Sequence, residues 1–167
     1  MGDVVVRPGT IDDLPRLTEI YNHYVLNTAT TFDLVPFSVD ERKAWFHRYA
    51  DRGRHRLIVA VEGSTVLGYA TTSRFHERAA YDTTVEMTVL SAPEAVGRGI
   101  GQRLYETLLP ALAGEDIHRA MALITMPNDA SVGLHERFGF TRAAVLTEVG
   151  RKFDRYWDVM WMERQFD

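Results

Sequence analysis

The sequence contains no cysteine in its 167 residues. This excludes disulfides, a thiol nucleophile and a cysteine-ligated metal site. The histidines show no metal-ligating spacing such as H-E-x-x-H, so we predict no metal. Two further features are missing: an apolar run of the roughly 20 residues that cross a bilayer, and an apolar secretory segment in the opening MGDVVVRPGT. We therefore expect a cytoplasmic protein with no membrane partner.

The sequence also lacks an excess of positive charge. Lys and Arg number 19 against 23 Asp and Glu, which gives a formal net charge of −4. A nucleic-acid-binding surface would require a basic stripe, so no nucleic-acid partner is predicted. No linker or repeat interrupts the chain, and 46% of its residues are hydrophobic. We expect residues 1–167 to form one domain around one core.

The sequence does contain a strand pattern that leads into a glycine-rich turn and a helix. Residues 84–90 alternate with the period of a strand, G-x-G-x-G follows at positions 97–101, and an apolar helical repeat begins at Ile100. Glycines let a ligand approach the backbone closely, and the first N–H groups of a helix have no partner within the helix. The segment therefore predicts a binding site for a diphosphate.

A run of three glycines is compatible with more than one kind of loop. A Rossmann dinucleotide site requires a different spacing near the start of the chain, and a Walker loop requires Gly-Lys-Ser/Thr, which is absent. A strand–helix turn that merely needs small residues accounts for the glycines equally well. A second segment, residues 124–140 (ITMPNDASVGLHERFGF), favours the ligand site: Asn128 is a good helix N-cap, and Gly139 suits the left-handed position beyond the helix end.

Together the two segments resemble the GCN5-related N-acetyltransferase (GNAT) superfamily. Its acyl-CoA loop, Gln/Arg-x-x-Gly-x-Gly/Ala, is matched by residues 96–101, with Val96 in place of Gln or Arg. Its later helix, Asn-x-x-Ser/Ala-x-x-Leu-Tyr/His-x-x-x-Gly-Phe, is matched by residues 128–140. The resemblance covers about Val5 to Phe166, and IYNHY (20–24), RAAY (78–81) and VGRKFDRYWD (149–158) narrow it to the phosphinothricin N-acetyltransferase group.

The resemblance implies the GNAT fold, an α/β (α+β) architecture in which helices flank a mixed, mostly antiparallel central sheet. The local patterns agree with this fold. Strands are predicted at residues 4–7, 57–61, 66–72, 84–90, 120–125, 143–149 and 157–163. Helices are predicted from the capping residues Thr10, Ser38 and Asn128 and from Ile100.

The resemblance also implies acetyl-CoA as the acetyl donor. Because the loop binds diphosphate mainly through backbone N–H groups, Val96 is expected to weaken binding at most. The backbone N–H of Leu90 or a neighbour is the expected donor to the developing oxyanion. The predicted cofactor-binding residues are Val89, Leu90, Ser91, Gly97, Arg98, Gly99, Ile100, Gly101, Gln102, Arg103, Asn128 and Ser131.

Acetyl transfer to an amine requires a base, because free amines are mostly protonated at neutral pH. Glu86, a carboxylate within an apolar and Thr-rich strand, is the predicted base; the alternatives are a carboxylate that faces solvent and a structural ion pair with Arg74 or Arg78. His135 is the second candidate and is expected to act as general acid, as a second base or as a hydrogen-bond partner of the cofactor; the alternative is a structural histidine whose hydrogen bonds are satisfied within the protein. Tyr105 is expected either to contact the thioester or pantetheine arm or to serve as packing.

The predicted acceptor site is based on Arg74 and Arg78, because a guanidinium suits a carboxylate or phosphinate. Phe32, Tyr81 and Trp157 are candidate pocket walls, with core packing as the alternative for each aromatic residue. The acceptor is expected to be a small amine such as an amino acid or analogue, and the family resemblance implies a homodimer. Two other functions stay open: acetylation of a protein or peptide amine, and a catalytically idle acyl-CoA-binding module.

Overall fold

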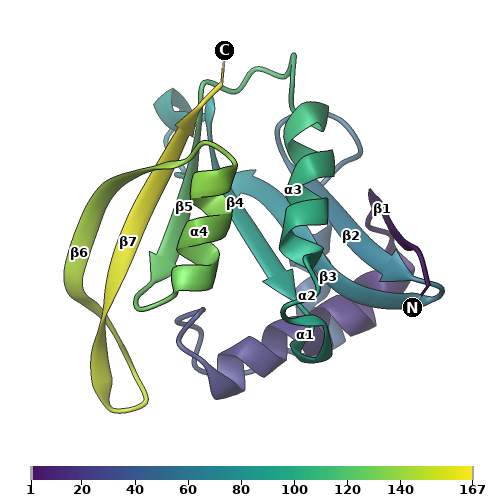
Figure 1. Ribbon diagram of the computed structural model, residues 1–167, viewed down its shortest axis with the longest axis horizontal. Coiled ribbons are helices and arrows are strands. Elements are labelled where there is room, and N and C mark those ends of the chain that lie inside the picture. Colours follow the sequence, from purple (N-terminus) through teal and green to yellow (C-terminus); the bar gives the residue numbers. More distant parts are fainter. Residues whose placement is uncertain (1, 167) are drawn as a thin grey trace.

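The computed structural model describes residues 2–166, which form a seven-stranded sheet with helices on both faces (Figure 1). The strand order is β1-β2-β3-β4-β5-β7-β6. The strands are β1 (Val4–Pro8), β2 (Arg56–Glu62), β3 (Thr65–Arg74), β4 (Thr84–Ser91), β5 (Arg119–Thr125), β6 (Thr141–Lys152) and β7 (Arg155–Gln165). The helices are α1 (Leu14–Asn27), α2 (Val39–Phe46), α3 (Ile100–Ala111) and α4 (Asp129–Arg137), with single 3-10 turns η1 (Ile11–Asp13), η2 (Ala79–Tyr81) and η3 (Pro93–Ala95).

The sheet is mixed, as predicted: β4 and β5 run parallel, and the other neighbouring strands are antiparallel. All seven predicted strands are confirmed, and each is extended by one to three residues at one or both ends. The second helix ends at Phe46, so Tyr49 lies beyond it. Two turns follow the helix, in which the N–H of Arg48 donates to the backbone oxygen of Trp45 and that of Tyr49 to the backbone oxygen of Phe46. No helix among residues 2–166 is long and apolar enough to span a membrane.

The predicted capping residues begin the first two helices. The backbone N–H of Thr10 donates to the carboxylate of Asp13 (2.8 Å), and η1 leads from this box into α1. Ser38 and Glu41 exchange hydrogen bonds at the start of α2, where the Ser38 N–H donates to the Glu41 carboxylate (2.7 Å). These contacts satisfy N–H groups that have no partner inside a helix.

The core lies on both faces of the sheet. The apolar repeat of α3 packs against β2, β3 and β4, and its side chains are at most 1% exposed: Ile100, Leu104, Leu108 and Leu112. On the opposite face, Leu14, Leu17 and Ile20 of α1 are buried to the same extent. Each such side chain contributes about 1.5–3 kcal/mol through burial, so both helix layers are held firmly on the sheet.

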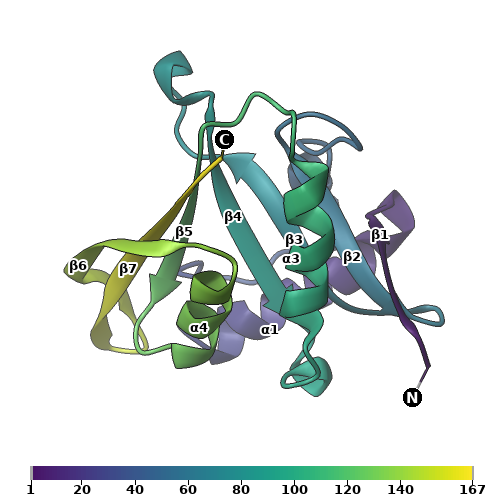
Figure 2. The ribbon, with the colours of Figure 1, turned by 45° about the horizontal axis from the view of Figure 1, so that its top comes forward.

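Strands β4 and β5 separate part-way along their length. They pair only over Thr84–Glu86 and Arg119–Met121, after which the two strands diverge (Figures 1 and 2). The remainder of β4, residues 87–91, has β3 on one side and no paired strand on the other. A parallel strand pair that stops early leaves backbone groups of β4 open at the centre of the sheet.

Candidate active site

A cavity of about 320 Å³ occupies the place where β4 and β5 separate. Its walls come from both strands, the loop after α1 and the start of α4. The lining residues are Tyr21, Thr30, Thr31, Phe32, Glu86, Met87, Thr88, Val89, Leu90, Ala122, Leu123, Ile124, Thr125, Asn128, Ser131, His135 and Val159. We call it the Glu86 cavity, because this is the acidic residue in its lining.

Glu86 lies on β4, opposite Ser73 of β3, at the last point where β4 pairs with β5. Burial raises the pKa of its carboxyl group, because the low-dielectric surroundings disfavour the charged form. Among the described residues the Glu86 carboxylate forms no ion pair, while Arg74 is paired with Asp82 at 3.0 Å. The alternative in which Arg74 or Arg78 neutralises Glu86 is therefore not what the structure shows.

His135 also lines the Glu86 cavity, but both of its ring nitrogens are occupied. Nδ1 lies 2.8 Å from the backbone oxygen of Ser131, which can only accept, so Nδ1 carries the proton. Nε2, 2.8 Å from the hydroxyl of Tyr105, must then accept. The side chain is 3% exposed, and burial lowers its pKa. The imidazole is thus held neutral in one tautomer.

The predicted contact of Tyr105 with the thioester or pantetheine arm does not fit its position. The Tyr105 side chain is 0% exposed and packs against Phe138 and Phe140, and its hydroxyl is used by His135. It lies inside the layer between α3 and α4, where burial raises its pKa. This position fits the packing alternative, and the polar contact of Tyr105 is with His135.

A second hollow, a groove of about 670 Å³, crosses the start of α3 towards α4. Within residues 2–166, five consecutive or near-consecutive backbone N–H groups in this wall have no protein partner: those of Gly97, Gly99, Ile100, Gly101 and Gln102. Free N–H groups at the positive end of a 12-residue helix are the chemistry that a diphosphate requires. The residues present therefore fit the phosphate part of a CoA molecule.

The glycines of the loop have separate roles. Gly97 (φ +80°) and Gly99 (φ +73°) adopt the left-handed backbone conformation, which a side chain would strain. Gly101 lies close to α4 instead: a Cβ there would lie 2.9 Å from Cδ2 of Leu134, so that side chain would have to shift. The loop conformation thus depends on glycine at Gly97 and Gly99, while the size of residue 101 affects the packing of α3 against α4.

Ten of the twelve predicted cofactor residues line this groove: Val89, Leu90, Ser91, Gly97, Gly99, Ile100, Gly101, Gln102, Asn128 and Ser131. The other two do not. Arg98 points to Glu62 and forms an ion pair with it (3.0 Å), and Arg103 is exposed on α3 away from the lining. Sequence reasoning missed Arg137, whose Nη1 donates to Oε1 of Gln102 (2.7 Å) across the groove. Arg137 lies beside the groove only because α4 packs close to α3, which the local sequence does not show.

The groove and the Glu86 cavity adjoin one another. Val89, Leu90, Asn128, Ser131 and Thr30 line both of them. Asn128 accepts a hydrogen bond from the Ser131 N–H (3.1 Å) and so caps α4 at this junction. A ligand held by the glycine loop can extend along β4 until its far end reaches Glu86.

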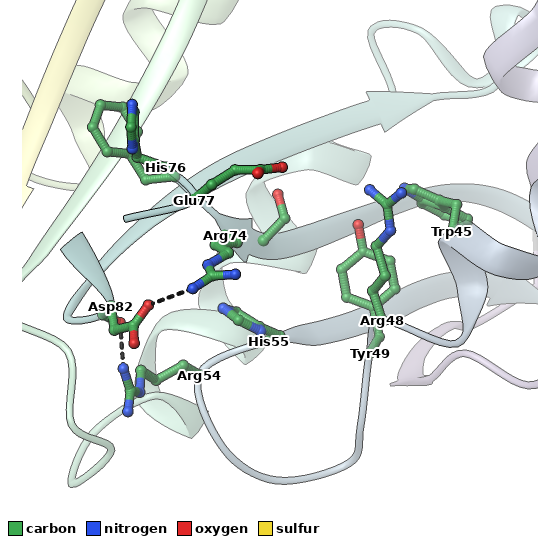
Figure 3. Close-up of a pocket in the computed structure, with 11 residues that line it drawn as sticks. Trp45, Arg48, Tyr49, Arg54, His55, Arg74, His76, Glu77 and Asp82 are labelled. Atoms are coloured by element: carbon green, nitrogen blue, oxygen red, sulfur yellow. Dashed lines mark hydrogen bonds and ion pairs between the residues drawn. The ribbon is translucent and has the colours of Figure 1, made fainter. Parts of the chain in front are cut away.

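The predicted acceptor residues are scattered rather than gathered. Phe32 lines the Glu86 cavity, as expected. Arg74 lines a separate cavity of about 930 Å³ beyond the end of β3, where it and Arg54 converge on Asp82 (Figure 3). Arg78 is exposed at the N-cap of η2 and is not part of the lining of these cavities.

The two other predicted aromatic walls lie elsewhere. Tyr81 is 41% exposed and packs on Phe75 and His76. Trp157 lies on the β6–β7 hairpin, where its Nε1 donates to the backbone oxygen of Lys152 (2.9 Å) and Arg155 stacks on its ring at 3.9 Å. Neither lines the Glu86 cavity, so their expected role as its walls is not supported.

Comparisons with known proteins agree with this geometry. The model of the acetyltransferase (GNAT) family matches residues 17–140. A phosphinothricin N-acetyltransferase of Streptomyces coelicolor is 53% identical over 97% of this chain and 96% of its own length. An L-methionine sulfoximine/L-methionine sulfone acetyltransferase of Pseudomonas aeruginosa is 32% identical over 97% of this chain and 94% of its own length.

A solved structure shows the same fold. The crystal structure of a phosphinothricin acetyltransferase from Sinorhizobium meliloti in complex with AcCoA superposes with a TM-score of 0.90 at 31% identity. The superposition covers 98% of this chain and 88% of that one. The resemblance inferred from the glycine loop and the Asn128 helix is confirmed, and the chain belongs to the acetyltransferase (GNAT) family.

Proposed function

We propose that this protein transfers the acetyl group of acetyl-CoA to the amine of a small amino acid or amino-acid analogue, of the phosphinothricin or methionine sulfoximine type. The single observation that carries the proposal is the position of Glu86. Its carboxylate is partly buried and forms no ion pair within residues 2–166, and it stands where the groove with free N–H groups adjoins a cavity of small-molecule size. The names of the relatives supply the type of acceptor.

The diphosphate of acetyl-CoA binds at the N–H groups of residues 97–102, and Arg137 adds positive charge beside them. The pantetheine arm follows β4 past Leu90 and presents the thioester, which supplies an activated acetyl group. A backbone N–H in residues 89–91, on the side of β4 that β5 has left, donates to the thioester oxygen as charge develops there.

Glu86 acts as the general base. Its carboxylate takes a proton from the ammonium group of the acceptor, and the free amine then forms the C–N bond as the thioester C–S bond breaks. The second proton lost from nitrogen neutralises the departing thiolate. His135 has no free nitrogen for either transfer, so its role is to hold α4 against Tyr105 of α3 and shape the cavity wall.

A thiol-release assay tests this function. Acetyl-CoA is mixed with phosphinothricin, methionine sulfoximine, methionine sulfone, the common amino acids and a peptide panel, one acceptor at a time. We expect CoA release with at least one amino acid or analogue, and an acetylated product by mass spectrometry. Acetylation of peptides alone would establish the protein acetyltransferase instead, and binding of acetyl-CoA without transfer to any amine would establish the idle module.

We also propose a homodimer. The edge strand β6 pairs with β7 on one side only, and its outer surface exposes Val145, Leu146 and Val149, with Phe153 at the hairpin turn. An exposed apolar edge strand is a natural surface for association. This surface supports the family expectation of a second copy of the chain.

A further inference from the structure

We infer that Arg42 on α2 is the specificity residue that binds the α-carboxylate of the acceptor. The inference rests on the proposed function and deepens it. Sequence reasoning did not single out Arg42, which lies three residues before Trp45 in a short, mostly polar helix. In the folded chain its side chain lies in a third cavity, of about 320 Å³, between α2 and the sheet. We call this space the Arg42 cavity.

Arg42 is buried without a partner for its charge. The residue is 5% exposed, and its Nε and Nη2 have no hydrogen-bond partner among residues 2–166. The guanidinium lies 3.7 Å from the ring centroid of Trp45 and 4.3 Å from that of Tyr21. Stacking on two aromatic rings stabilises the cation in part, but a buried charge with unused donors still lacks the anion that its fork is suited to bind.

Two carboxylates line the Arg42 cavity, and each accepts a hydrogen bond from another residue. Asp33 lines the cavity and accepts a hydrogen bond from the Tyr21 hydroxyl, and Glu41 is held by Ser38 in the capping box of α2. Neither forms an ion pair with Arg42 in the described part of the chain. Arg74, one of the two arginines favoured from sequence, differs in this respect because Asp82 already pairs with it.

The Arg42 cavity adjoins the Glu86 cavity. Tyr21 and Thr88 line both of them. Glu86 and Thr88 are alternate residues of β4, on the same face and therefore about 7 Å apart. Polar residues of β3 lie beside both positions, with Thr71 opposite Thr88 and Ser73 opposite Glu86. One small molecule can place its amine at Glu86 and its carboxylate at Arg42.

This arrangement selects a free amino acid. The α-carboxylate is the anion that phosphinothricin, methionine sulfoximine and methionine sulfone have in common, whereas the sulfone and sulfoximine head groups carry no charge at neutral pH. A peptide or an amino-acid amide presents an uncharged carbonyl at the same place. Leaving the buried guanidinium unpaired is then costly, so such acceptors are rejected.

The test compares each acceptor with its methyl ester. For the parent enzyme we expect the KM of the free acid to be about 10- to 100-fold lower than that of the ester, the discrimination that charge-assisted hydrogen bonds provide. Arg42→Gln should raise the KM of the acid by that factor and leave the KM of the ester and kcat nearly unchanged. Arg42→Lys keeps the positive charge but loses the planar guanidinium, so its KM for the acid should lie between those of the parent enzyme and Arg42→Gln. The matched control is Lys43→Gln, the exposed next residue paired with Asp40, which should alter neither KM.

Several outcomes would overturn the inference. Equal KM values for the acid and the ester in the parent enzyme would overturn it and leave the proposed function intact. A rise of the acid KM and the ester KM by the same factor in Arg42→Gln would have the same meaning. If Arg42→Gln does not fold, judged by its melting curve, Arg42→Lys decides through the same acid-to-ester ratio. Calorimetric titration of the acid and the ester into the enzyme with CoA measures the ratio of their dissociation constants without turnover. This test of Arg42 therefore remains valid even if no amine is acetylated. A preference for the phosphinate of phosphinothricin over its carboxylate, seen when each is blocked in turn, would assign Arg42 to the head group instead.

Discussion

At Glu86, partial burial raises the pKa of the carboxyl group, and no ion pair within residues 2–166 opposes this effect. Desolvation raises its pKa from the ordinary value of 4.5, and among the described residues no cation lowers it again. A carboxylate with a raised pKa is a stronger proton acceptor, which is what removal of a proton from an ammonium group requires. The same residue would be a poor choice for structure alone, since buried charges without partners destabilise a fold.

We predict that Glu86→Gln lowers kcat about 10²- to 10⁴-fold, the usual contribution of a general base, with little change in acetyl-CoA affinity. The parent enzyme needs Glu86 deprotonated, so its kcat/KM should fall as the pH drops through the raised pKa of Glu86, above 4.5. This acidic limb should be missing from the variant. Steady-state kinetics across pH, with calorimetry for the cofactor, measure both effects. Full activity of Glu86→Gln at every pH would remove Glu86 from the mechanism.

Tyr105 and His135 form a buried pair that joins α3 to α4. We predict that Tyr105→Phe destabilises the protein by about 1–3 kcal/mol, because it leaves the Nε2 acceptor of His135 buried and unpaired. Since neither ring transfers a proton in the proposed mechanism, kcat should change far less than in Glu86→Gln. Denaturant unfolding and steady-state kinetics on the same samples test this. A loss of kcat as large as that of Glu86→Gln, in a variant that stays folded, would assign this pair to proton transfer.

At the scale of elements, the turn before α3 decides how closely a cofactor can approach the helix N-terminus. We predict that Gly99→Val weakens acetyl-CoA binding by at least tenfold, because a β-branched residue is strained at φ +73° and its side chain would cover the free N–H groups. Gly114→Val is the matched control: Gly114 has a similar φ of +85°, but it lies beyond the far end of α3. Calorimetry on both variants provides the comparison. Parent-like affinity in Gly99→Val would refute the placement of the diphosphate.

The β6–β7 hairpin holds the loop of residues 28–37 that walls the Glu86 cavity. Lys152 is 4% exposed and its Nζ donates to the backbone oxygen of Thr31 (2.8 Å). Gly150 touches the Phe32 ring so closely that a Cβ would lie 2.2 Å from Cε2. The hairpin therefore determines where Phe32 stands in the cavity wall.

We predict that Gly150→Ala displaces Phe32, costs about 1–3 kcal/mol in stability, and raises the KM of the acceptor more than that of acetyl-CoA. In a Phe32→Leu background the smaller side chain gives way, so Gly150→Ala should cost less there. The free energy of unfolding is measured for the parent protein, Gly150→Ala, Phe32→Leu and the double variant. These four values form a double-mutant cycle that gives the coupling energy between the two residues. Additive costs would show that the hairpin does not press on Phe32.

At the scale of the whole molecule, the proposed dimer predicts a measurable change of mass. Light scattering at micromolar concentration should give twice the chain mass of 19.0 kDa. Val145 (52% exposed) and Val149 (56% exposed) lie on the unpaired side of the sheet, so replacing both with Lys should give monomers that remain folded. A parent protein that runs as a monomer would disprove the dimer, and a dimeric double variant would place its interface elsewhere.

The sequence alone determined those features that depend on residues close together in the chain. The alternation in residues 84–90, the glycines before Ile100 and the caps at Ser38 and Asn128 each act within one turn or one strand. Their physical cause is local, in backbone conformation and unpaired N–H groups, so they can be predicted without knowing what packs against them. Glu86 is predictable in the same way, as a carboxylate in an apolar strand.

The tertiary structure decided which distant side chains meet. Tyr105 and His135 are 30 residues apart, Arg98 and Glu62 36 apart, and nothing in their local patterns links them. Aromatic residues at buried spacing look alike whether they fill a core or wall a pocket, which is why sequence patterns place Tyr105 and Trp157 in the site and miss Arg42. The early end of the β4–β5 pairing is likewise a property of the whole sheet. It creates the opening in which Glu86, the groove and the Arg42 cavity come together, because only packed elements determine where a sheet leaves space.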